Sequence, residues 1–189
     1  MTKQARVLTD RELQRLLDFV AKGKNAKRNR AILSCTHFAG MRIGEVAAVR
    51  VYDVLASDGT IRTEIQLSAA QTKCDKGRTV LLNQRLQAEL AAYVQSIRVR
   101  DKKQPLFATQ RSVGFTANSL TQVVNGIYKR AGLDGATSHS GRRGFITNLA
   151  ERGVSARVMM ALSGHSAMSS LQRYIELRPG VLRNAVELI

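Results

Sequence analysis

The chain has 189 residues, of which 44% are hydrophobic and only two are proline, so it can bury one sizeable core but is too short for two full enzyme domains. Thirty Lys and Arg residues against 14 Asp and Glu residues give a formal charge of +16, which exceeds what solubility requires and favours a polyanionic partner. The sequence has no apolar run long enough to cross a bilayer and no signal-peptide pattern at its N-terminus, so we expect a cytoplasmic protein.

The positive charge makes nucleic acid the leading candidate partner. The alternatives are a basic surface that is merely solvated and binding to an anionic membrane, but no basic amphipathic helix dominates the sequence, which weakens the membrane explanation. Cys35 and Cys74 are well separated and lack the Cys and His spacing that holds zinc. We therefore expect two free thiols in a reducing compartment.

The N-terminal quarter of the chain reads as three helices. Residues 9–12, Thr-Asp-Arg-Glu, have the form of a capping box, and leucine and valine follow at helical spacing over residues 13–20. The basic stretch 22–30 predicts a loop that is solvated or faces phosphate. An apolar helix should follow over residues 31–40, and a third, short helix over residues 42–49.

A small antiparallel sheet is predicted in the next part of the chain. Asp58-Gly59 reads as a turn, and apolar or β-branched residues alternate at period two over residues 61–67. A second turn separates this strand from a second one over residues 78–82. The tip of the resulting hairpin would carry Lys73 and Lys76.

Helices dominate the remainder of the sequence, with predicted spans of 86–97, 120–128, 142–152 and 155–163. The last two should end at Gly153 and Gly164, where a left-handed C-cap is useful. The apolar stripe of residues 181–189 would dock on its own core or on a neighbouring subunit. The fold class is therefore mainly α with a small antiparallel β-sheet (α+β), and residues 1–189 form one domain without a linker or repeat.

Reactive side chains gather near the C-terminus. His139-Ser140-Gly141-Arg142 is followed by Gly164-His165 and then by Tyr174, all within 36 residues. A tyrosine that attacks a phosphodiester needs nearby cations and proton donors that neutralise and steer the phosphate. This set indicates phosphoryl transfer on DNA.

The order and spacing of five pieces resemble the catalytic domain of the tyrosine recombinases, or phage integrase family. His165 follows His139 by 26 residues and Tyr174 follows His165 by 9, in agreement with the pattern of that family. The resemblance covers nearly the whole chain and implies the fold of that domain. The pieces are Gly-Met-Arg-Ile-Gly-Glu (40–45), Thr72-Lys73, His139-x-x-Arg142, Leu-Ser-Gly-His (162–165) and Tyr174.

The resemblance also implies a role for each reactive side chain. Arg42 and Arg142 would clamp the scissile phosphate, because a planar guanidinium donates two parallel hydrogen bonds and stays charged. Tyr174 would attack phosphorus and form a 3′-phosphotyrosyl bond, leaving a free 5′-hydroxyl. A phenol is a poor nucleophile at neutral pH, so His139 would accept its proton, while His165 would hydrogen-bond a phosphate oxygen.

The departing 5′-oxygen needs a proton, and Lys73 is the candidate general acid, with Lys76 as the alternative. Glu45 could orient Arg42 or the helix that follows it. Two arginines and a lysine supply the positive charge, and the sequence shows no carboxylate cluster, so we expect neither a metal nor another cofactor.

Two features depart from the family pattern. Family members commonly have Leu-Arg-His where this chain has Gly141-Arg142-Arg143, so the helix packing at Gly141 is an open question. Most members also have a helical DNA-binding domain before the catalytic one, whereas this chain begins only 41 residues before Arg42. We expect that domain to be absent, as in a single-domain recombinase, unless the chain is a fragment of a longer protein.

The sequence thus predicts a site-specific recombinase or integrase that cuts and rejoins double-stranded DNA through a phosphotyrosyl intermediate. It would assemble as a homo-tetramer on DNA, with accessory DNA-binding proteins as possible partners, and would be associated with the nucleoid when bound. One alternative is a DNA-binding regulator, a degenerate recombinase that does not cut. The other is a type I-B topoisomerase-like enzyme, which shares the chemistry but does not exchange partners.

Overall fold

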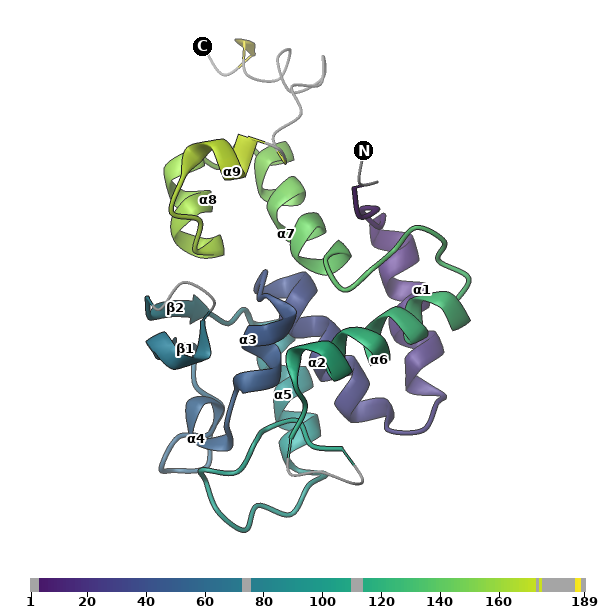
Figure 1. Ribbon diagram of the computed structural model, residues 1–189, viewed down its shortest axis with the longest axis vertical. Coiled ribbons are helices and arrows are strands. Elements are labelled where there is room, and N and C mark those ends of the chain that lie inside the picture. Colours follow the sequence, from purple (N-terminus) through teal and green to yellow (C-terminus); the bar gives the residue numbers. More distant parts are fainter. Residues whose placement is uncertain (1–3, 73–75, 110–113, 173, 175–185, 188–189) are drawn as a thin grey trace.

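The computed structural model describes residues 4–72, 76–109, 114–172, 174 and 186–187 (Figure 1). Within these residues the chain is mainly helical and has one two-stranded antiparallel sheet, so the predicted fold class is confirmed. The elements are α1 (Asp10–Ala21), α2 (Ala26–Phe38), α3 (Ile43–Ala48), α4 (Val51–Val54), β1 (Glu64–Leu67), the 3₁₀ helix η1 (Ala69–Gln71), β2 (Arg78–Leu81), α5 (Gln84–Val94), α6 (Ala117–Arg130), α7 (Ser140–Glu151), α8 (Ala156–Ser163) and α9 (Met168–Gln172).

The predicted capping box at the start of α1 is confirmed. The Glu12 amide donates to the Thr9 hydroxyl at 3.3 Å, and the Glu12 carboxylate accepts from the Thr9 amide at 3.0 Å. Two of the amides that lack a partner inside the helix are thereby satisfied. The inward face of the helix then buries Leu16, Leu17 and Val20 in the main core.

The predicted basic loop over residues 22–30 was wrong in its second half, because α2 begins at Ala26. Alanine, lysine and arginine are good helix formers, so local propensity permits the early start. Tertiary contacts then fix it: Arg30 forms an ion pair with Glu89 of α5 and donates to the Leu17 carbonyl at 3.0 Å. Arg30 is therefore held against protein groups, unlike the solvated or phosphate-facing side chain that we expected.

The hairpin pairs β1 with β2 in a register that runs from Glu64 opposite Leu81 to Leu67 opposite Arg78. Its inner face is buried, with Ile65 and Val80 directly opposite one another. The first strand is shorter than predicted, because Ile61 forms only an isolated bridge. Lys73 lies outside the described residues, and Lys76 is exposed.

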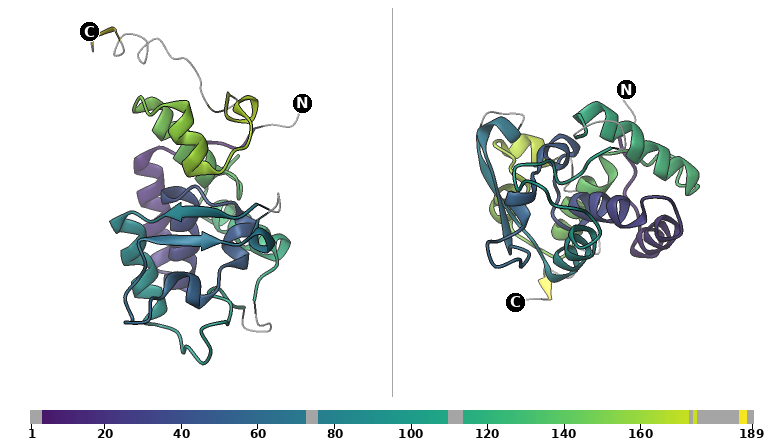
Figure 2. Two further views of the ribbon diagram at one scale, coloured as in Figure 1. Left: turned by 90° about the vertical axis from the view of Figure 1, so that its left-hand side faces the viewer. Right: turned by 90° about the horizontal axis from the view of Figure 1, so that it is seen from below.

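Two apolar clusters divide the molecule. The larger one involves α1 to α6 and the hairpin, and the smaller one centres on Ile146 of α7, Met159 of α8 and Leu171 of α9. In Figures 1 and 2 the helices α7, α8 and α9 form one end of the molecule, and the hairpin lies beside the larger body, where β2 contacts α8. The segments that carry Arg42, Arg142, His165 and Tyr174 meet between the two clusters.

The predicted ends of α7 and α8 are confirmed at their glycines. Gly153 follows α7 with φ 74°, and Gly164 caps α8 with φ 67°. Both values lie in the left-handed region that glycine enters without the steric cost of a side chain. The turn at Gly164 matters most, because it leads directly into His165.

Gly141 allows an unusually close approach between α7 and α2. A Cβ atom at this position would lie 2.3 Å from the Thr36 hydroxyl oxygen, 2.8 Å from the Thr36 Cβ and 2.9 Å from Cδ2 of His37. The question left by the sequence thus has a steric answer, because a larger residue at position 141 requires α2 to move.

Gly141→Ala should destabilise the fold by about 1–3 kcal/mol, because the added methyl overpacks the contact between α7 and α2. Gly144→Ala in the same helix is the matched control. Its Cβ would meet only Val7, at an ordinary 3.8 Å, so helix propensity should make the change neutral or stabilising by about 0.5–1 kcal/mol. Thermal unfolding of the two variants tests this expectation, and equal melting temperatures would refute it.

His37 is buried beneath this contact and shares a hydrogen bond of 2.9 Å with the Tyr128 hydroxyl. Burial lowers the pKa of His37 from 6.5 to about 4. The folded protein therefore holds this imidazole neutral at pH values where an unfolded chain would protonate it.

The free energy of unfolding should consequently fall as the pH drops below 6.5, because His37 binds a proton in the unfolded chain but stays neutral in the folded chain. Between pH 6.5 and pH 4 the loss at this residue should reach about 3 kcal/mol. Denaturant unfolding of the wild type and of His37→Gln across this range measures the difference. Parallel curves would show that His37 contributes nothing to the pH dependence.

Candidate active site

Glu45 occupies the centre of the site and is only 2% exposed. It lies in the first turn of α3, where its carboxylate accepts a hydrogen bond of 2.8 Å from the Arg42 amide and one of 2.9 Å from Arg42 Nη1. The carboxylate thus caps α3 and orients the arginine that precedes it, as the sequence suggested.

A second guanidinium completes the coordination of this carboxylate. Arg78, at the start of β2, donates from Nε to Oε1 of Glu45 at 3.1 Å and from Nη2 to Oε2 at 2.7 Å. Burial alone would raise the pKa of Glu45, but the hydrogen bonds and charge of Arg78, followed by the hydrogen bonds of Arg42, outweigh burial and lower the pKa. Glu45 is therefore a buried anion, held as such by two cations.

Arg142 reaches the same place from α7 and is 6% exposed. Its Nη1 donates to the Gly40 carbonyl at 2.6 Å, and its Nη2 lies 3.3 Å from Nε2 of His165. Burial and then the charge of Arg42 lower the pKa of Arg142 to about 10. The guanidinium is still a cation at neutral pH. Because burial and the nearby charge of Arg42 disfavour this cation, an anion that binds beside it is stabilised.

The protonation of His165 follows from its neighbours. Ser163 has one hydroxyl proton, which it donates to the Met159 carbonyl at 2.6 Å. Nδ1 of His165 lies 2.7 Å from the Ser163 hydroxyl oxygen, so Nδ1 must carry the proton and donate it to this oxygen. The lone pair of Nε2 then faces Arg142. Burial, and then the charge of Arg142, lower the pKa of His165 to about 4, in agreement with this neutral form.

Gly164 brings the His165 turn against both arginines of the main body. Its carbonyl accepts from Nη2 of Arg42 at 3.1 Å. A Cβ atom on Gly164 would lie 2.5 Å from Cδ of Arg78. Glycine is thus required here both for its backbone conformation and for the space that Arg78 occupies.

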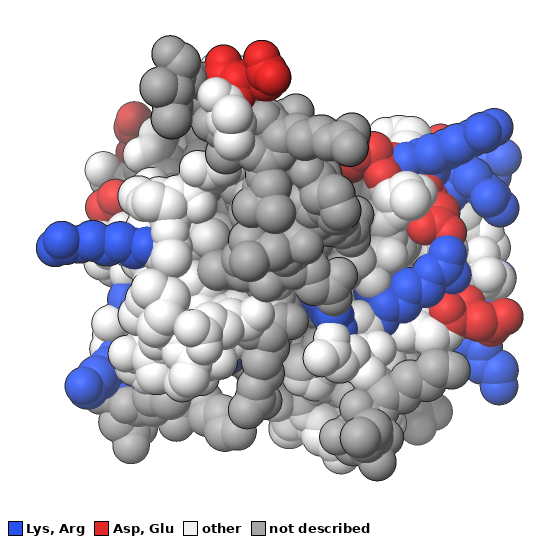
Figure 3. Space-filling view, turned by 90° about the horizontal axis from the view of Figure 1, so that it is seen from above, with Lys and Arg blue, Asp and Glu red and all other residues white. Residues whose placement is uncertain are grey.

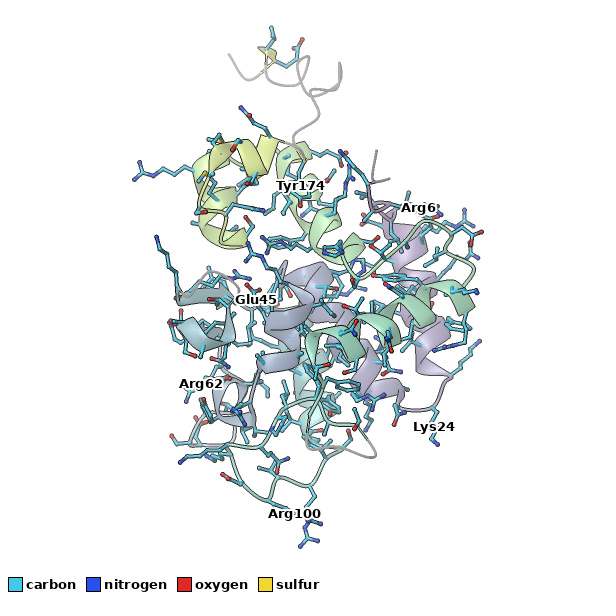
Figure 4. The ribbon with its side chains drawn as sticks, viewed as in Figure 1. Arg6, Lys24, Glu45, Arg62, Arg100 and Tyr174 are labelled. Carbon is cyan, nitrogen blue, oxygen red and sulfur yellow. The ribbon has the colours of Figure 1, made fainter. Side chains whose placement is uncertain are left out.

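Tyr174 faces His165 from the smaller apolar cluster. The centroids of the two rings are 5.7 Å apart, and the tyrosine ring packs against the cluster of α7, α8 and α9. Figure 4 shows Tyr174 beside α7 and α9, above Glu45, which lies between α3 and the hairpin. Arg42, Arg142, His165 and Tyr174, which the sequence singled out, are therefore brought together.

The cluster is suited to an oxyanion. The site contains three guanidinium groups, two of them paired with the one carboxylate, so it keeps a positive charge while His165 is neutral. Arg42 and Arg142 each use two of their five N–H donors on described protein partners, which leaves donors for phosphate oxygens. Two such arginines on one phosphate provide geometry as well as charge.

His139 is not part of this cluster. It precedes α7, its side chain is exposed, and it makes no side-chain hydrogen bond to another described residue. It stands one helical turn before Arg142, so it borders the site without entering it. Neither candidate acid is seen in place, since Lys73 is outside the described residues and the Lys76 side chain is exposed.

Arg78 and Ser163 were missed by the sequence reasoning. Nothing local distinguishes Arg78 among the 30 basic residues, because its carboxylate partner is 33 residues away. Ser163 could have been found, since a hydroxyl two residues before a reactive histidine can reach its ring.

The described basic residues do not gather in one patch on the face seen in Figure 3. Lys and Arg side chains project from its two sides, and acidic side chains lie on both of these sides and at the upper edge. No three His, Cys, Asp or Glu side chains in the described part of the chain lie close enough to hold a metal ion. None of the described helices is long and apolar enough to span a membrane.

The geometry and the fold agree with comparisons to known proteins. The model of the phage integrase family matches residues 6–180, so the chain belongs to that family. It is 27% identical over 183 residues to the tyrosine recombinase XerA of Pyrococcus furiosus, covering 95% of this chain and 60% of that protein. It is 26% identical over 184 residues to XerD of Oceanobacillus iheyensis, covering 94% and 60% respectively. The chain thus spans about 60% of the length of these relatives.

Solved structures share the fold. A crystal structure of XerA recombinase superposes with a TM-score of 0.77 at 24% identity, covering 97% of this chain and 64% of that one. The site-specific recombinase XerH bound to its difH substrate gives a TM-score of 0.72 at 23% identity, covering 97% and 53%. The predicted recombinase catalytic-domain fold is therefore confirmed.

Nitrogen-15 NMR at neutral pH should find His165 protonated at Nδ1 and free at Nε2. Ser163→Ala removes the acceptor of the Nδ1 proton and should shift the tautomer ratio toward the other form by about twofold to tenfold. Ser163→Thr keeps the hydroxyl and is the control. A wild-type spectrum with the proton on Nε2 would contradict the assignment.

Proposed function

We propose that this protein is a site-specific DNA recombinase that cuts and rejoins strands through a covalent phosphotyrosyl intermediate. One observation carries the proposal: Arg42, Arg142, His165 and Tyr174 come from separate segments and converge in a single cationic site. Membership of the phage integrase family and the similarity to proteins named tyrosine recombinases support it.

In the proposed cleavage step the two arginines hold the non-bridging oxygens of the scissile phosphate. The Tyr174 oxygen attacks phosphorus, its proton passes to His139 at the border of the site, and a 3′-phosphotyrosyl bond forms. As negative charge shifts onto the phosphate oxygens, Arg42 and Arg142 stabilise the transition state. The phosphodiester energy is kept in the new bond, so religation needs no nucleotide cofactor.

The bond that breaks joins phosphorus to the 5′-oxygen of the next nucleotide. That oxygen leaves as a hydroxyl once it receives a proton, and Lys73 is the proposed donor, with Lys76 as the alternative. His165 hydrogen-bonds a phosphate oxygen. Because Nε2 is an acceptor in the DNA-free site, this role requires His165 to gain a proton there as the phosphate arrives.

The partner proposed for this site is double-stranded DNA, and the described chain would act as the catalytic domain. Solved structures with this fold include a transposon integrase in complex with circular intermediate DNA and XerH bound to its difH substrate. Assembly as a homo-tetramer on two duplexes, help from accessory DNA-binding proteins and a location on the nucleoid complete the proposal.

A nicked duplex from DNA flanking the gene should trap a covalent protein–DNA adduct, visible on a denaturing gel, because the nick lets the short cleaved strand diffuse away. Tyr174→Phe should abolish the adduct, since it removes the attacking oxygen. Tyr52→Phe is the matched control, because Tyr52 is an exposed tyrosine of α4 and its loss should leave the adduct unchanged.

Two outcomes would count against the proposal. Binding without any adduct, on DNA that contains the target site, would point to a regulator that occupies DNA without cutting. An adduct that survives in Tyr174→Phe would assign the nucleophile to another residue.

A further inference from the structure

Arg78 has no part in the proposed reaction, yet it joins three segments that meet at the phosphate site. From the start of β2 it holds Glu45 of α3 and donates from Nη1 to the Leu162 carbonyl near the end of α8 at 3.0 Å. We propose that Arg78 is a positioning residue for strand cleavage, which fixes Arg42 and the His165 turn relative to each other without touching DNA. This inference rests on the proposed function of the site.

The use of its donors separates Arg78 from the arginines that would bind phosphate, because the side chains of Arg42 and Arg142 bond described residues through their Nη atoms alone. Its side chain is 10% exposed, so Arg78 is buried much as Arg142 is, at 6%, and more than Arg42, at 30%. All three of its side-chain nitrogens, Nε, Nη1 and Nη2, already donate to protein oxygens. A group so occupied has little capacity left for a ligand, and its contribution must pass through its neighbours.

One route of action runs through Glu45 to Arg42. Oε1 of Glu45 accepts from Nε of Arg78 and from Nη1 of Arg42, while Oε2 accepts from Nη2 of Arg78 and from the Arg42 amide. The paired bonds from Arg78 prevent the carboxylate from rotating about its terminal bond. They thereby fix the direction in which Arg42 is held.

The other route runs through the turn before His165. Arg78 holds the Leu162 carbonyl, and its Cδ lies in the space that a side chain on Gly164 would fill. Arg42 holds the Gly164 carbonyl from the other side. The turn is thus fastened by two arginines that are themselves fastened to one carboxylate.

The test is single-turnover formation of the covalent adduct by the full chain on the nicked duplex, at saturating DNA, with DNA affinity measured separately. Arg78→Lys keeps a positive charge beside Glu45 but loses the paired bonds, and it should slow cleavage by about 10- to 100-fold with the Kd for DNA unchanged. Arg62→Lys, an exposed arginine before β1, should retain the wild-type rate.

Two further measurements distinguish positioning from other roles. In an Arg42→Lys background, Arg78→Lys should slow cleavage by less than it does in the wild type, because both changes act on one unit. In a substrate with sulfur in place of the leaving 5′-oxygen, the sulfur leaves as a thiolate and needs no proton. This substrate should therefore rescue a variant that lacks the general acid, but it should not rescue Arg78→Lys.

The inference is overturned by a folded Arg78→Lys protein that cleaves at the wild-type rate, by losses that multiply fully with Arg42→Lys, or by rescue with the sulfur substrate. A loss of DNA affinity that equals the loss of rate would overturn it too, because it would place Arg78 on the DNA. Failure of the wild type to form any adduct would instead refute the proposed function.

Discussion

A single buried carboxylate organises this molecule. Glu45 would be costly to bury alone, since an unpaired charge in the interior is strongly destabilising. Arg42 and Arg78 make its burial possible, and in doing so they tie the start of α3 to the start of β2. This arrangement links the hairpin to α3 and sets the direction of Arg42. It also holds Arg78 where it bonds the Leu162 carbonyl near the end of α8.

The site lies where two apolar clusters meet, and each cluster supplies different chemistry. The larger one supports the arginine and glutamate framework, while α7 and the segments that follow α8 and α9 supply Arg142, His165 and Tyr174. Polar bonds cross between them, from Arg42 to Gly164 and from Arg142 to the Gly40 carbonyl. This boundary places the reactive groups beside rigid supports on both sides, which is what precise positioning of a phosphate requires.

Local signals were sufficient for much of the fold. The capping box at Thr9 and the glycine that ends α8 each depend on a few adjacent residues, so the sequence predicted both. The early start of α2 depends on the pairing of Arg30 with Glu89, 59 residues away, and no local pattern reports it. The site divides in the same way: spacing pointed to Arg42, Arg142, His165 and Tyr174, but the ion pair that makes Arg78 distinctive exists only in three dimensions.

The contact between Gly141 and Thr36 also constrains how this sequence can diverge. The two positions lie on different helices, yet position 141 cannot gain a Cβ while Thr36 stays where it is. A descendant that acquires the leucine common at position 141 must first, or at once, move α2 outward, because the Cβ of residue 36 and the His37 ring would remain within 3 Å of the new Cβ even if the Thr36 hydroxyl were lost. Substitutions at 36 and 141 are therefore coupled, and the order in which they arise determines which evolutionary routes pass through a folded protein.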